Sequence, residues 1–485
     1  MKNPTKILQI QILSILILFL QAAYVTAQTD VPAGDVSGTW SVTNSPYNIN
    51  GEITVPDSNT LTIEPGVQVI FTGHYKLNVQ GTLLAVGTNT DTITFSAQDT
   101  ATGWNGLRFI HTPSNNDTSK VMYCRIEDGR TTESSDSSGG AILVNGLDKL
   151  VISHCLIMHN RTTGAIYTGG GGIAVYGSSP DIESNTICFN EAIGGHGGGI
   201  LLVNGADVRF VNNLVFGNEA TGGGAMALNM SDPVIMNNTF TANSSEHAGG
   251  LDFIYTSPTV INSIIYGNTA GYGKQIGLAG GVQPAFYNCD IEGGTAAIPA
   301  DLITSGSYNG TYTDNIDEDP MFIDPVNSDY HLSDASPCIS AGNDTIDDGG
   351  NLFYSPVWDA EGNARPDPSG TPSDIGALEN ANGHVPMHVS DLKDHNAIRG
   401  VTLAQNYPNP FRSETIIQFV IPENLKVKLQ VFDPEGRTVA NLVDKILSPG
   451  TYQFKFDATG LSGGIYFYRL AAGNTIQIRK CQVIK

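Results

Sequence analysis

The sequence predicts an all-β chain in which a long parallel β-helix precedes a small antiparallel β-sandwich. Three observations carry this prediction. A Gly-rich repeat of about 25 to 30 residues fills the middle of the chain, like positions of successive repeats hold like residues, and about the last 85 residues change to alternating strands between Pro/Gly turns. Gly supplies 55 of the 485 residues and charged residues only 15% of them, which is typical of short strands and turns.

The repeat runs over residues 139–294. Each unit has a Gly-rich step, an apolar segment, a turn, a second apolar segment and a terminal Asn, found at Asn160, Asn190, Asn218, Asn243 and Asn268. Aligning the units gives two apolar columns, which are Ile152, Ile182, Phe210, Ile235, Val260 and Ile157, Ile187, Val215, Phe240, Ile265. Between them lie two polar columns, His154, Ser184, Asn212, Asn237, Asn262 and Cys155, Asn185, Asn213, Asn238, Ser263. Such columns form when coils stack about 4.8 Å apart, and Asn suits both a left-handed turn and an amide ladder.

Short β-rich runs extend this stack upstream through residues 51–110. We therefore assign residues 51–300 to β-helix coils. Because both ends of a solenoid need protection from edge pairing, residues 28–50 are expected to be an N-terminal cap and residues 301–380 the C-terminal part or cap of the β-helix.

The N-terminus has the pattern of an export signal. Lys2 and Lys6 precede an apolar core, and Val25-Thr26-Ala27 has the small-x-small form of a cleavage site, so residues 1–27 are predicted to be a signal peptide. The alternative is an uncleaved anchor, for which the apolar core is short. No later stretch has 18 consecutive apolar residues, so we expect no transmembrane segment in the mature protein.

Charge is distributed unevenly along the chain. Residues 28–400 contain 12 Lys and Arg against 41 Asp and Glu, whereas residues 401–485 contain 10 against 6. An acidic body of this kind argues against nucleic-acid binding. It also disfavours polyanionic sugars unless divalent cations bridge them.

The predicted β-helix resembles known surface proteins. WSVTNSPYNINGEITVPDSNTLTIEPGVQVIFTG, from Trp40 to Gly73, resembles the opening of bacterial right-handed β-helix proteins of the pectin-lyase-like superfamily. The Gly-rich steps with their terminal Asn are similar to the repeats of chlamydial polymorphic outer membrane proteins. DPMFIDPVNSDYHLSDASPCISAGND, from Asp319 to Asp344, resembles the terminal segment of such proteins. The resemblance covers residues 31–380 and implies a right-handed β-helix, but not one activity.

Residues 381–400 are polar and irregular, and are predicted to be a linker. The segment 401–485 that follows has strands expected near 415–419, 427–432, 451–456 and 464–470. It resembles the C-terminal sorting domain of the type IX secretion system. The matching motif residues are Asn406, Pro408, Asn409, Pro410, Phe411, Gly436, Gly464, Tyr466 and Lys485.

The sorting resemblance implies a partner and a place. The partner is the type IX secretion machinery, and the place is the outer surface or surroundings of a Gram-negative bacterium, reached through the periplasm. Removal of the module and attachment of the body to surface lipopolysaccharide, or its release, are implied as well. Cys481 departs from the basic or apolar residue expected in the final motif. The alternative is a fibronectin-like binding module.

Enzymes of the pectin-lyase-like superfamily guide a search for catalytic residues. A lyase site needs clustered Asp ligands for Ca²⁺ and an Arg or Lys base, but Arg209 lies mid-strand without an Asp column and is expected to pair with Asp181. Gly195-His196-Gly197 resembles a polygalacturonase motif, yet the Asp347-Asp348 pair follows it in the wrong order. No catalytic residue is therefore assigned.

Three weaker candidates remain. The first-turn positions are expected to share a column that stacks on a glycan, with ordinary turn chemistry as the alternative; they are Asn145, Tyr176, Asn204, Asn229 and Tyr255. Candidate Ca²⁺ ligands, with solvated acidic turns as the alternative, are Asp344, Asp347 and Asp348. No other metal or cofactor is expected. Cys124 and Cys155 are expected to be vertical neighbours and buried thiols, with a disulfide between them as the alternative.

These observations favour a secreted or cell-surface β-helix that is non-catalytic and serves adhesion or glycan and matrix binding. Two alternatives stay open, namely a polysaccharide lyase or glycoside hydrolase with an unusual site, and a structural protein of the cell envelope.

Overall fold

The structure is a computed structural model. It describes residues 28–131, 136–164 and 168–381 of the first part of the chain, and in the C-terminal part 401–403, 406, 411, 414–421, 424–434, 437–447, 450–473 and 475–484. The chain divides into two compact units, Met1–Val385 and Pro386–Lys485, each of which is described by itself. The predicted signal peptide and nearly all of the predicted linker lie outside the described residues.

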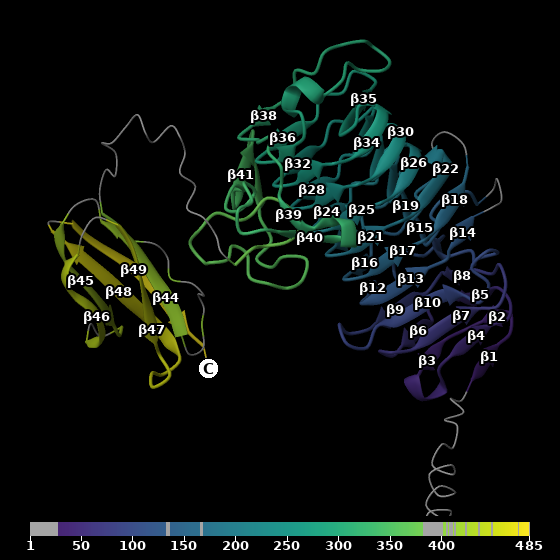
Figure 1. Cartoon of the computed structure of the whole chain (residues 1–485). Helices are drawn as coiled ribbons and strands as arrows, with labels where there is room; N and C mark the ends of the chain where they lie inside the picture. Colours follow the sequence, from purple (N-terminus) through teal and green to yellow (C-terminus); the bar gives the residue numbers. More distant parts are fainter. Residues whose placement is uncertain are drawn as a thin grey trace, which may run out of the picture. The chain divides into compact units, whose positions relative to one another are not determined.

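The first unit is a parallel β-helix in which successive coils add one strand to each of three sheets (Figure 1). Sheet A has eleven strands, β1 (Thr29–Val31), β4 (Tyr47–Ile49), β7 (Gln68–Phe71), β10 (Ile93–Ala97), β13 (Cys124–Glu127), β17 (Leu156–Met158), β21 (Thr186–Cys188), β25 (Leu214–Phe216), β29 (Thr239–Thr241), β33 (Ile264–Tyr266) and β37 (Asp290–Ile291). Sheet B has ten, β2 (Gly34–Asp35), β5 (Ile53–Val55), β8 (Leu77–Val79), β11 (Leu107–Ile110), β15 (Ile142–Asn145), β19 (Ile173–Tyr176), β23 (Ile200–Val203), β27 (Met226–Asn229), β31 (Leu251–Ile254) and β35 (Ile276–Ala279).

Sheet C completes the wall of the solenoid. Its eleven strands are β3 (Gly38–Trp40), β6 (Thr60–Ile63), β9 (Thr82–Val86), β12 (Ser119–Met122), β16 (Leu150–Ser153), β20 (Asp181–Glu183), β24 (Arg209–Val211), β28 (Val234–Met236), β32 (Thr259–Ile261), β36 (Ala285–Tyr287) and β38 (Tyr312–Thr313). A fourth sheet, sheet E, lies between sheets A and B along the chain and consists of β14 (Arg130–Thr131), β18 (Arg161–Thr163), β22 (Glu191–His196), β26 (Glu219–Gly222), β30 (Ser244–His247) and β34 (Thr269–Tyr272).

The predicted columns are confirmed. Ile152 pairs with Ile182 and Ile182 with Phe210 in parallel register, and the column continues to Val260 with every member buried. Alternation along each short strand places one set of side chains inside the solenoid, where apolar burial stabilises the stack. The Gly-rich step has a steric cause, since a Cβ on Gly198 would lie 2.4 Å from the carbonyl oxygen of Gly224 in the next coil.

Buried Asn side chains form two ladders along the stack. Asn190 donates through Nδ2 to Ile157 O at 2.9 Å and to Asn218 Oδ1 at 3.0 Å, and the ladder runs on through Asn243 to Asn268. The second ladder passes through Asn185, Asn213 and Asn238, as the alignment predicts. Each amide thereby satisfies backbone carbonyls that would otherwise be buried without partners at the bends.

The ends of the stack differ from the predicted caps. Residues 28–46 already form a coil, because β1, β2 and β3 pair in parallel with β4, β5 and β6 of the next coil; η1 (Val42–Asn44) is a turn within it. At the other end η2 (Gly294–Ala297) follows the last coils, and Tyr308 and Tyr312 pack on the buried ring of Phe286. Residues 294–313 therefore close this end.

Residues 321–380 lie along the side of the solenoid, so the predicted C-terminal cap is only partly a cap. This side cover contains two antiparallel pairs and a short turn, β39 (Phe322–Asp324), η3 (Pro325–Asn327), β40 (Asp329–Leu332), β41 (Thr345–Asp348) and β42 (Asn351–Tyr354). Its apolar side chains pack on outward positions of the coils, for example Ile375 near Ile264 and Ile346 near Met236.

The second unit is made of two antiparallel sheets around a separate core. One sheet contains β43 (Thr402–Leu403), β44 (Glu414–Ile421) and β47 (Gly450–Asp457); the other has the order β46 (Thr438–Leu447), β45 (Leu425–Phe432), β48 (Gly464–Ala472) and β49 (Thr475–Val483). The four predicted strands are present as β44, β45, β47 and β48, and β43, β46 and β49 are additional. No helix in the described part of the chain is long and apolar enough to span a membrane.

Candidate functional site

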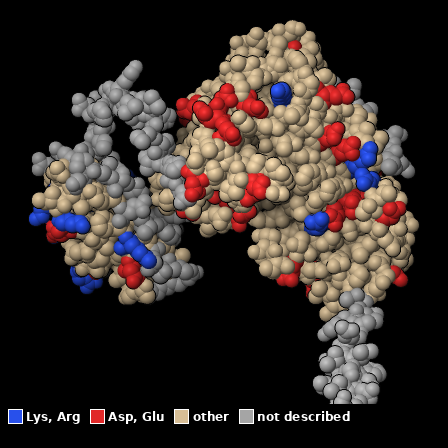
Figure 2. Space-filling view, viewed as in Figure 1, with Lys and Arg blue, Asp and Glu red and all other residues tan. Residues whose placement is uncertain are grey.

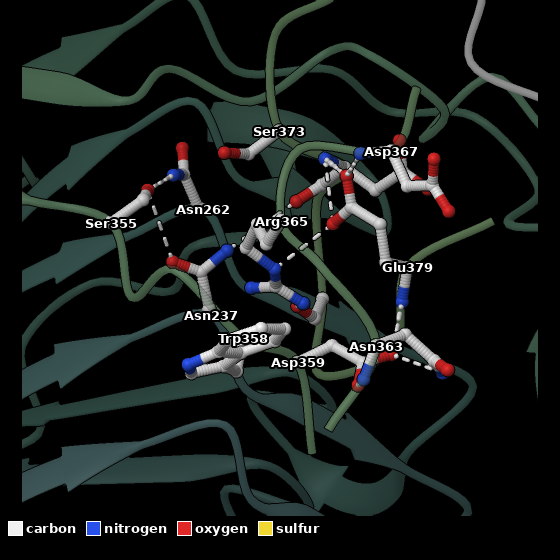
Figure 3. A network of polar contacts seen from close by, with 12 residues as sticks. Asn237, Asn262, Ser355, Trp358, Asp359, Asn363, Arg365, Asp367, Ser373 and Glu379 are labelled. Carbon is white, nitrogen blue, oxygen red and sulfur yellow. Dashed lines mark hydrogen bonds and ion pairs between the residues drawn. The ribbon is translucent and has the colours of Figure 1, made fainter. Parts of the chain in front are cut away.

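The side cover is fastened to the solenoid through the Asn column at the turn between sheets C and A. Asn212, Asn237 and Asn262 all have left-handed backbone, with φ between 47° and 58°, which turns their amides outward. Asn212 donates to Trp358 O at 2.7 Å, and Asn262 donates to Asn343 O at 2.9 Å. Figure 3 shows the amides of Asn237 and Asn262 facing Ser355 of the side cover. The turn residues thus hold a segment more than 80 residues further along the chain.

A buried ion pair stands at the centre of this contact. Arg365 Nε lies 2.9 Å from Glu379 Oε2, with both side chains fully buried, and Arg365 Nη1 donates to Asn212 Oδ1 at 3.2 Å. Burial raises the pKa of Glu379 above its ordinary value, and the contact with Arg365 opposes that rise. Removing either partner would leave an uncompensated charge inside the protein.

A shallow groove of about 340 Å³ opens where the side cover stops on sheet A. Its floor is the outward face of β21 and β25, and one wall is the segment around β40. The side chains that line it combine hydroxyl, charged and apolar groups; among them are Ser184, Thr186, Leu214, Phe216, Tyr330 and His331. Such a mixture on a concave surface is typical of small-molecule sites.

Two carboxylates hold a histidine at the mouth of the groove. Asp329 Oδ1 lies 2.6 Å from His331 Nδ1, and Glu361 Oε1 lies 3.3 Å from His331 Nε2. Burial lowers the pKa of His331, but the two carboxylates outweigh it and raise that pKa above its ordinary value. The hydrogen bond from His331 lowers the pKa of Asp329. An imidazolium engaged at both nitrogens is a poor general base.

Aromatic rings extend from the groove along sheet A. Phe216 packs against Tyr330 with ring centroids 4.8 Å apart, and Phe189 meets Phe216 edge-on at 5.2 Å. Phe189 is 43% exposed and stacks on His159 in the preceding coil. Phe189 therefore offers an exposed ring at the rim of the groove.

The predicted first-turn column is divided by the register. Asn145 pairs with Tyr176, but Tyr176 pairs with Val203 rather than with Asn204. Asn229 continues the first set and is buried. Asn204 and Tyr255 belong to the next position, where the backbone is left-handed and Tyr255 is 51% exposed. The five residues therefore present two adjacent rows, away from the residues that line the groove.

The predicted calcium ligands are engaged by protein groups. Asp348 accepts hydrogen bonds from Thr259 Oγ1 and from the Tyr287 hydroxyl, both at 2.7 Å. Asp347 accepts one from the Gly350 amide, and Asp344 accepts from Ser373. Within the described ranges, no three His, Cys, Asp or Glu side chains gather as metal ligands would.

The motifs considered for catalysis occupy structural positions. Asp181 and Arg209 are paired in register, but the ion pair of Arg209 is with Glu183, so the predicted partner was wrong. His196 Nδ1 lies 3.6 Å from Oδ2 of the buried Asp252 in sheet B. Gly222 leaves room for this contact, since a Cβ there would meet both side chains. Neither group lines the groove.

All six cysteines are free and buried. Cys124 and Cys155 occupy the inner polar column below Asn185, and each thiol donates to a carbonyl as the Asn amides do, for example Cys155 Sγ to Val121 O at 3.3 Å. Burial, together with the neighbouring Cys155, raises the pKa of Cys124 well above its ordinary value. The two thiols thus take the place that Asn has in the later coils of this column. The prediction of buried thiols is confirmed.

Several predicted sorting-motif residues hold the second unit together. Asn406 is buried, and its backbone N–H donates to the Tyr468 hydroxyl at 2.7 Å. It therefore supports the core of the unit rather than its surface. Phe411 joins the end of the chain to the core, because its N–H donates to Gln482 O and its carbonyl accepts from Ile484 N–H. Tyr466 is buried and donates to Ser462 O, and Gly464 pairs with Val483.

The remaining motif positions are outside the described residues, namely Pro408, Asn409, Pro410, Gly436 and Lys485. Cys481, the departure from the expected motif, points into the core and is fully buried. Burial raises its pKa to about 11. The position therefore needs a small apolar side chain, which a thiol supplies.

Two family models match the chain. The model of a right-handed β-helix region matches residues 165–291, and that of a secretion system C-terminal sorting domain matches residues 405–485. No curated protein and no solved structure matches the chain.

The fold and these matches define the class: the chain is a right-handed parallel β-helix protein with a C-terminal sorting domain. The sorting domain is of the type IX secretion system, which implies export by that machinery and a secreted or cell-surface location.

Proposed function

We propose that the exported β-helix binds a neutral glycan in the groove on sheet A and does not cleave it. The observation that carries this proposal is the groove itself, which the Phe216–Tyr330 pair lines together with the hydroxyls of Ser184 and Thr186. The exposed ring of Phe189 meets Phe216 edge-on and extends this aromatic surface beyond the groove. Sugars present apolar C–H faces to aromatic rings and hydroxyls to polar groups, so this combination suits them.

The negative charges around the groove favour a neutral sugar over an anionic one. Asp329 and Glu361 stand at the mouth, and Figure 2 shows many acidic and few basic side chains over the visible face of the first unit. A polyanionic sugar would be repelled by this surface, whereas hydroxyl groups of a neutral sugar can donate to the carboxylates.

The surroundings of the titratable groups support binding without cleavage. His331 is held between two carboxylates, and the described residues contain no cluster of metal ligands and no basic side chain among those that line the groove besides His331. Lyase chemistry needs a base near a cation that stabilises the sugar acid. A glycoside hydrolase that uses Asp329 and Glu361 is the alternative, because two carboxylates do flank the mouth.

The proposal includes a location after export. Removal of the sorting domain would leave the β-helix attached to surface lipopolysaccharide or released, where it would serve adhesion or matrix binding. The predicted turn rows, with the exposed ring of Tyr255, offer a second surface on which a longer glycan could stack.

A glycan array with the secreted protein, followed by a lyase and hydrolase screen of each bound glycan with and without Ca²⁺, tests the proposal. We expect binding to neutral glycans that falls at least tenfold for Phe189→Ala and stays unchanged for Val42→Ala, an exposed apolar residue elsewhere on the β-helix. Release of reducing or unsaturated sugar, or the absence of any bound glycan, would contradict it.

A further inference from the structure

The sorting domain has one sheet face that differs from an ordinary solvent-facing sheet. In the sheet β46-β45-β48-β49, alternate residues point into the core, and the others form what we call the outer face. The outer positions of β48 and β49 carry large apolar side chains, with exposed fractions of 44% for Ile465, 38% for Phe467, 64% for Ile476 and 60% for Ile478. A sheet that faces only water normally alternates to polar residues there.

Basic side chains lie between these apolar ones in a regular pattern. Arg469 stands directly opposite Ile478 across the β48–β49 ladder, and Lys480 stands opposite Phe467. Each cation therefore adjoins an exposed apolar side chain, since directly opposed residues of an antiparallel pair share a face. The result is a mixed apolar and basic surface over two neighbouring strands.

The cation at the centre of this surface is held in place. Arg469 lies over the ring of Phe432, with 4.8 Å from its guanidinium carbon to the ring centroid, and it donates to Gln430 Oε1 at 3.0 Å. A guanidinium fixed in this way loses little freedom when it meets a carboxylate. On the same face Asp444 is 3.6 Å from Lys428, so this acidic group is already offset.

The β49 edge of the sheet is partly occupied within the domain. The Phe411 backbone pairs with Val483, and the side chains of Arg479 and Gln477 hydrogen-bond the backbone of Leu403. These contacts come from the strand edge and from inward-pointing positions, which leaves the outer face as the broad surface that a partner can approach.

We propose that the outer face of β48 and β49 is the surface by which the export machinery recognises this chain, and that its partner is an acidic, apolar surface of a machinery component. The match to a secretion sorting domain means that a secretion system must recognise this unit. Clustered exposed apolar groups mark interaction sites on soluble proteins, and the cations favour a partner of negative charge. The claim concerns export and is independent of what the β-helix binds.

Export of the full chain in a bacterium with a type IX secretion system tests the proposal. The double variant Ile476→Ser/Ile478→Ser should lower the fraction of protein outside the cell at least tenfold and accumulate it in the periplasm. The matched control is Ile446→Ser, which removes an isoleucine of 72% exposure from the opposite edge strand, β46, and should be exported normally. Export of the double variant at the wild-type level would overturn the proposal.

Two further measurements distinguish recognition from misfolding and from binding of another partner to this face. Lys480→Glu changes an exposed strand position without removing apolar surface. It should lower export at least threefold while the protease resistance of the periplasmic protein stays unchanged, and normal export would overturn the role of charge. A photo-reactive residue at position 478 should cross-link to a component of the secretion machinery. A product of twice the chain's mass, or a cross-link to the chain's own acidic body, would instead contradict the proposed partner.

Discussion

Sheet A has two stretches that share one backbone design but differ in their surroundings. On β13 the outward side chains of Arg125 and Glu127 are partly exposed and pair with each other. On β29 and β33 the outward side chains of Thr239 and Ile264 are buried beneath the side cover. The coils themselves are alike, so the difference lies in what packs on them.

The comparison shows where binding surfaces arise on a repetitive scaffold. A bare sheet offers a flat surface, and a covered sheet offers none, whereas the boundary between them is concave. Ser184 and Thr186 belong to the last coil before the cover, and Tyr330 and Glu361 belong to the cover. The repeat therefore supplies the floor of the groove and the non-repetitive segment supplies its wall.

The largest expected effect comes from releasing the cover. Arg365→Met leaves the Glu379 carboxylate buried without its cation, which should lower the free energy of unfolding of the covered stretch by about 3–5 kcal/mol. Hydrogen exchange should rise at the turns of Asn212 and Asn262 and stay unchanged at residues 124–158.

Arg209→Met provides the control for this change, since the Arg209–Glu183 pair is exposed and should be worth less than about 1 kcal/mol. Equal loss of protection in the bare and covered stretches would contradict the distinction between them.

Breaking the Asn ladder should lower stability by a similar amount in the bare and covered stretches, because the ladder lies inside the solenoid. Asn190→Ala, in the coil of the groove floor, removes an amide that satisfies two acceptors, and Asn243→Ala, in the covered stretch, removes one that satisfies three. Each should cost about 2–3 kcal/mol in denaturant unfolding. Asn204→Gly, at an exposed turn with left-handed backbone that Gly also adopts, should change stability by less than about 0.5 kcal/mol. A ladder variant as mild as Asn204→Gly would refute this view of the ladder.

A pH effect on stability is expected near the covered end. Burial raises the pKa of Asp290 to about 7, against opposing hydrogen bonds from the Cys338 thiol and the Glu318 amide. Because the folded state holds the proton more tightly than the unfolded chain, this contribution is present below about pH 4 and is lost as pH rises through 7. Thermal unfolding of Asp290→Asn from pH 4 to 8 should show a weaker fall than wild type; an unchanged profile would exclude Asp290 as its source.

Much of the solenoid follows from the sequence, and the groove does not. Ile152 and Ile182 align because inward packing repeats every coil, and Asn190 and Asn218 align because each must satisfy the same bend. The predicted single column of first-turn residues is not formed, and the reason is local. Asn145 ends its strand before the left-handed Gly146, whereas Val203 ends the matching strand and Asn204 itself takes that left-handed position.

The side cover and the groove have no periodic signal. Thr186 and Tyr330 are far apart in the chain, and nothing in the spacing of either predicts their approach. The Asn212 column did signal a left-handed turn, yet its role as a fastening for Trp358 and Arg365 depends on tertiary packing. Sequence periodicity thus predicts what repeats, and only the structure places what does not.

The smallest structural effect should be at the rim. Phe189→Ala removes an exposed ring, so unfolding should shift by less than about 1 kcal/mol even though glycan binding weakens. Loss of binding together with a large loss of stability would mean that Phe189 supports the fold rather than the ligand.

Hydrogen exchange of the secreted protein, with and without the neutral oligosaccharide that binds it most tightly, tests the central claim most directly. The account predicts that the sugar protects residues 184–189, 214–216 and 327–331, which meet at the boundary between bare and covered sheet. Protection confined to the turns of Asn204 and Tyr255, or protection nowhere on the β-helix, would contradict it.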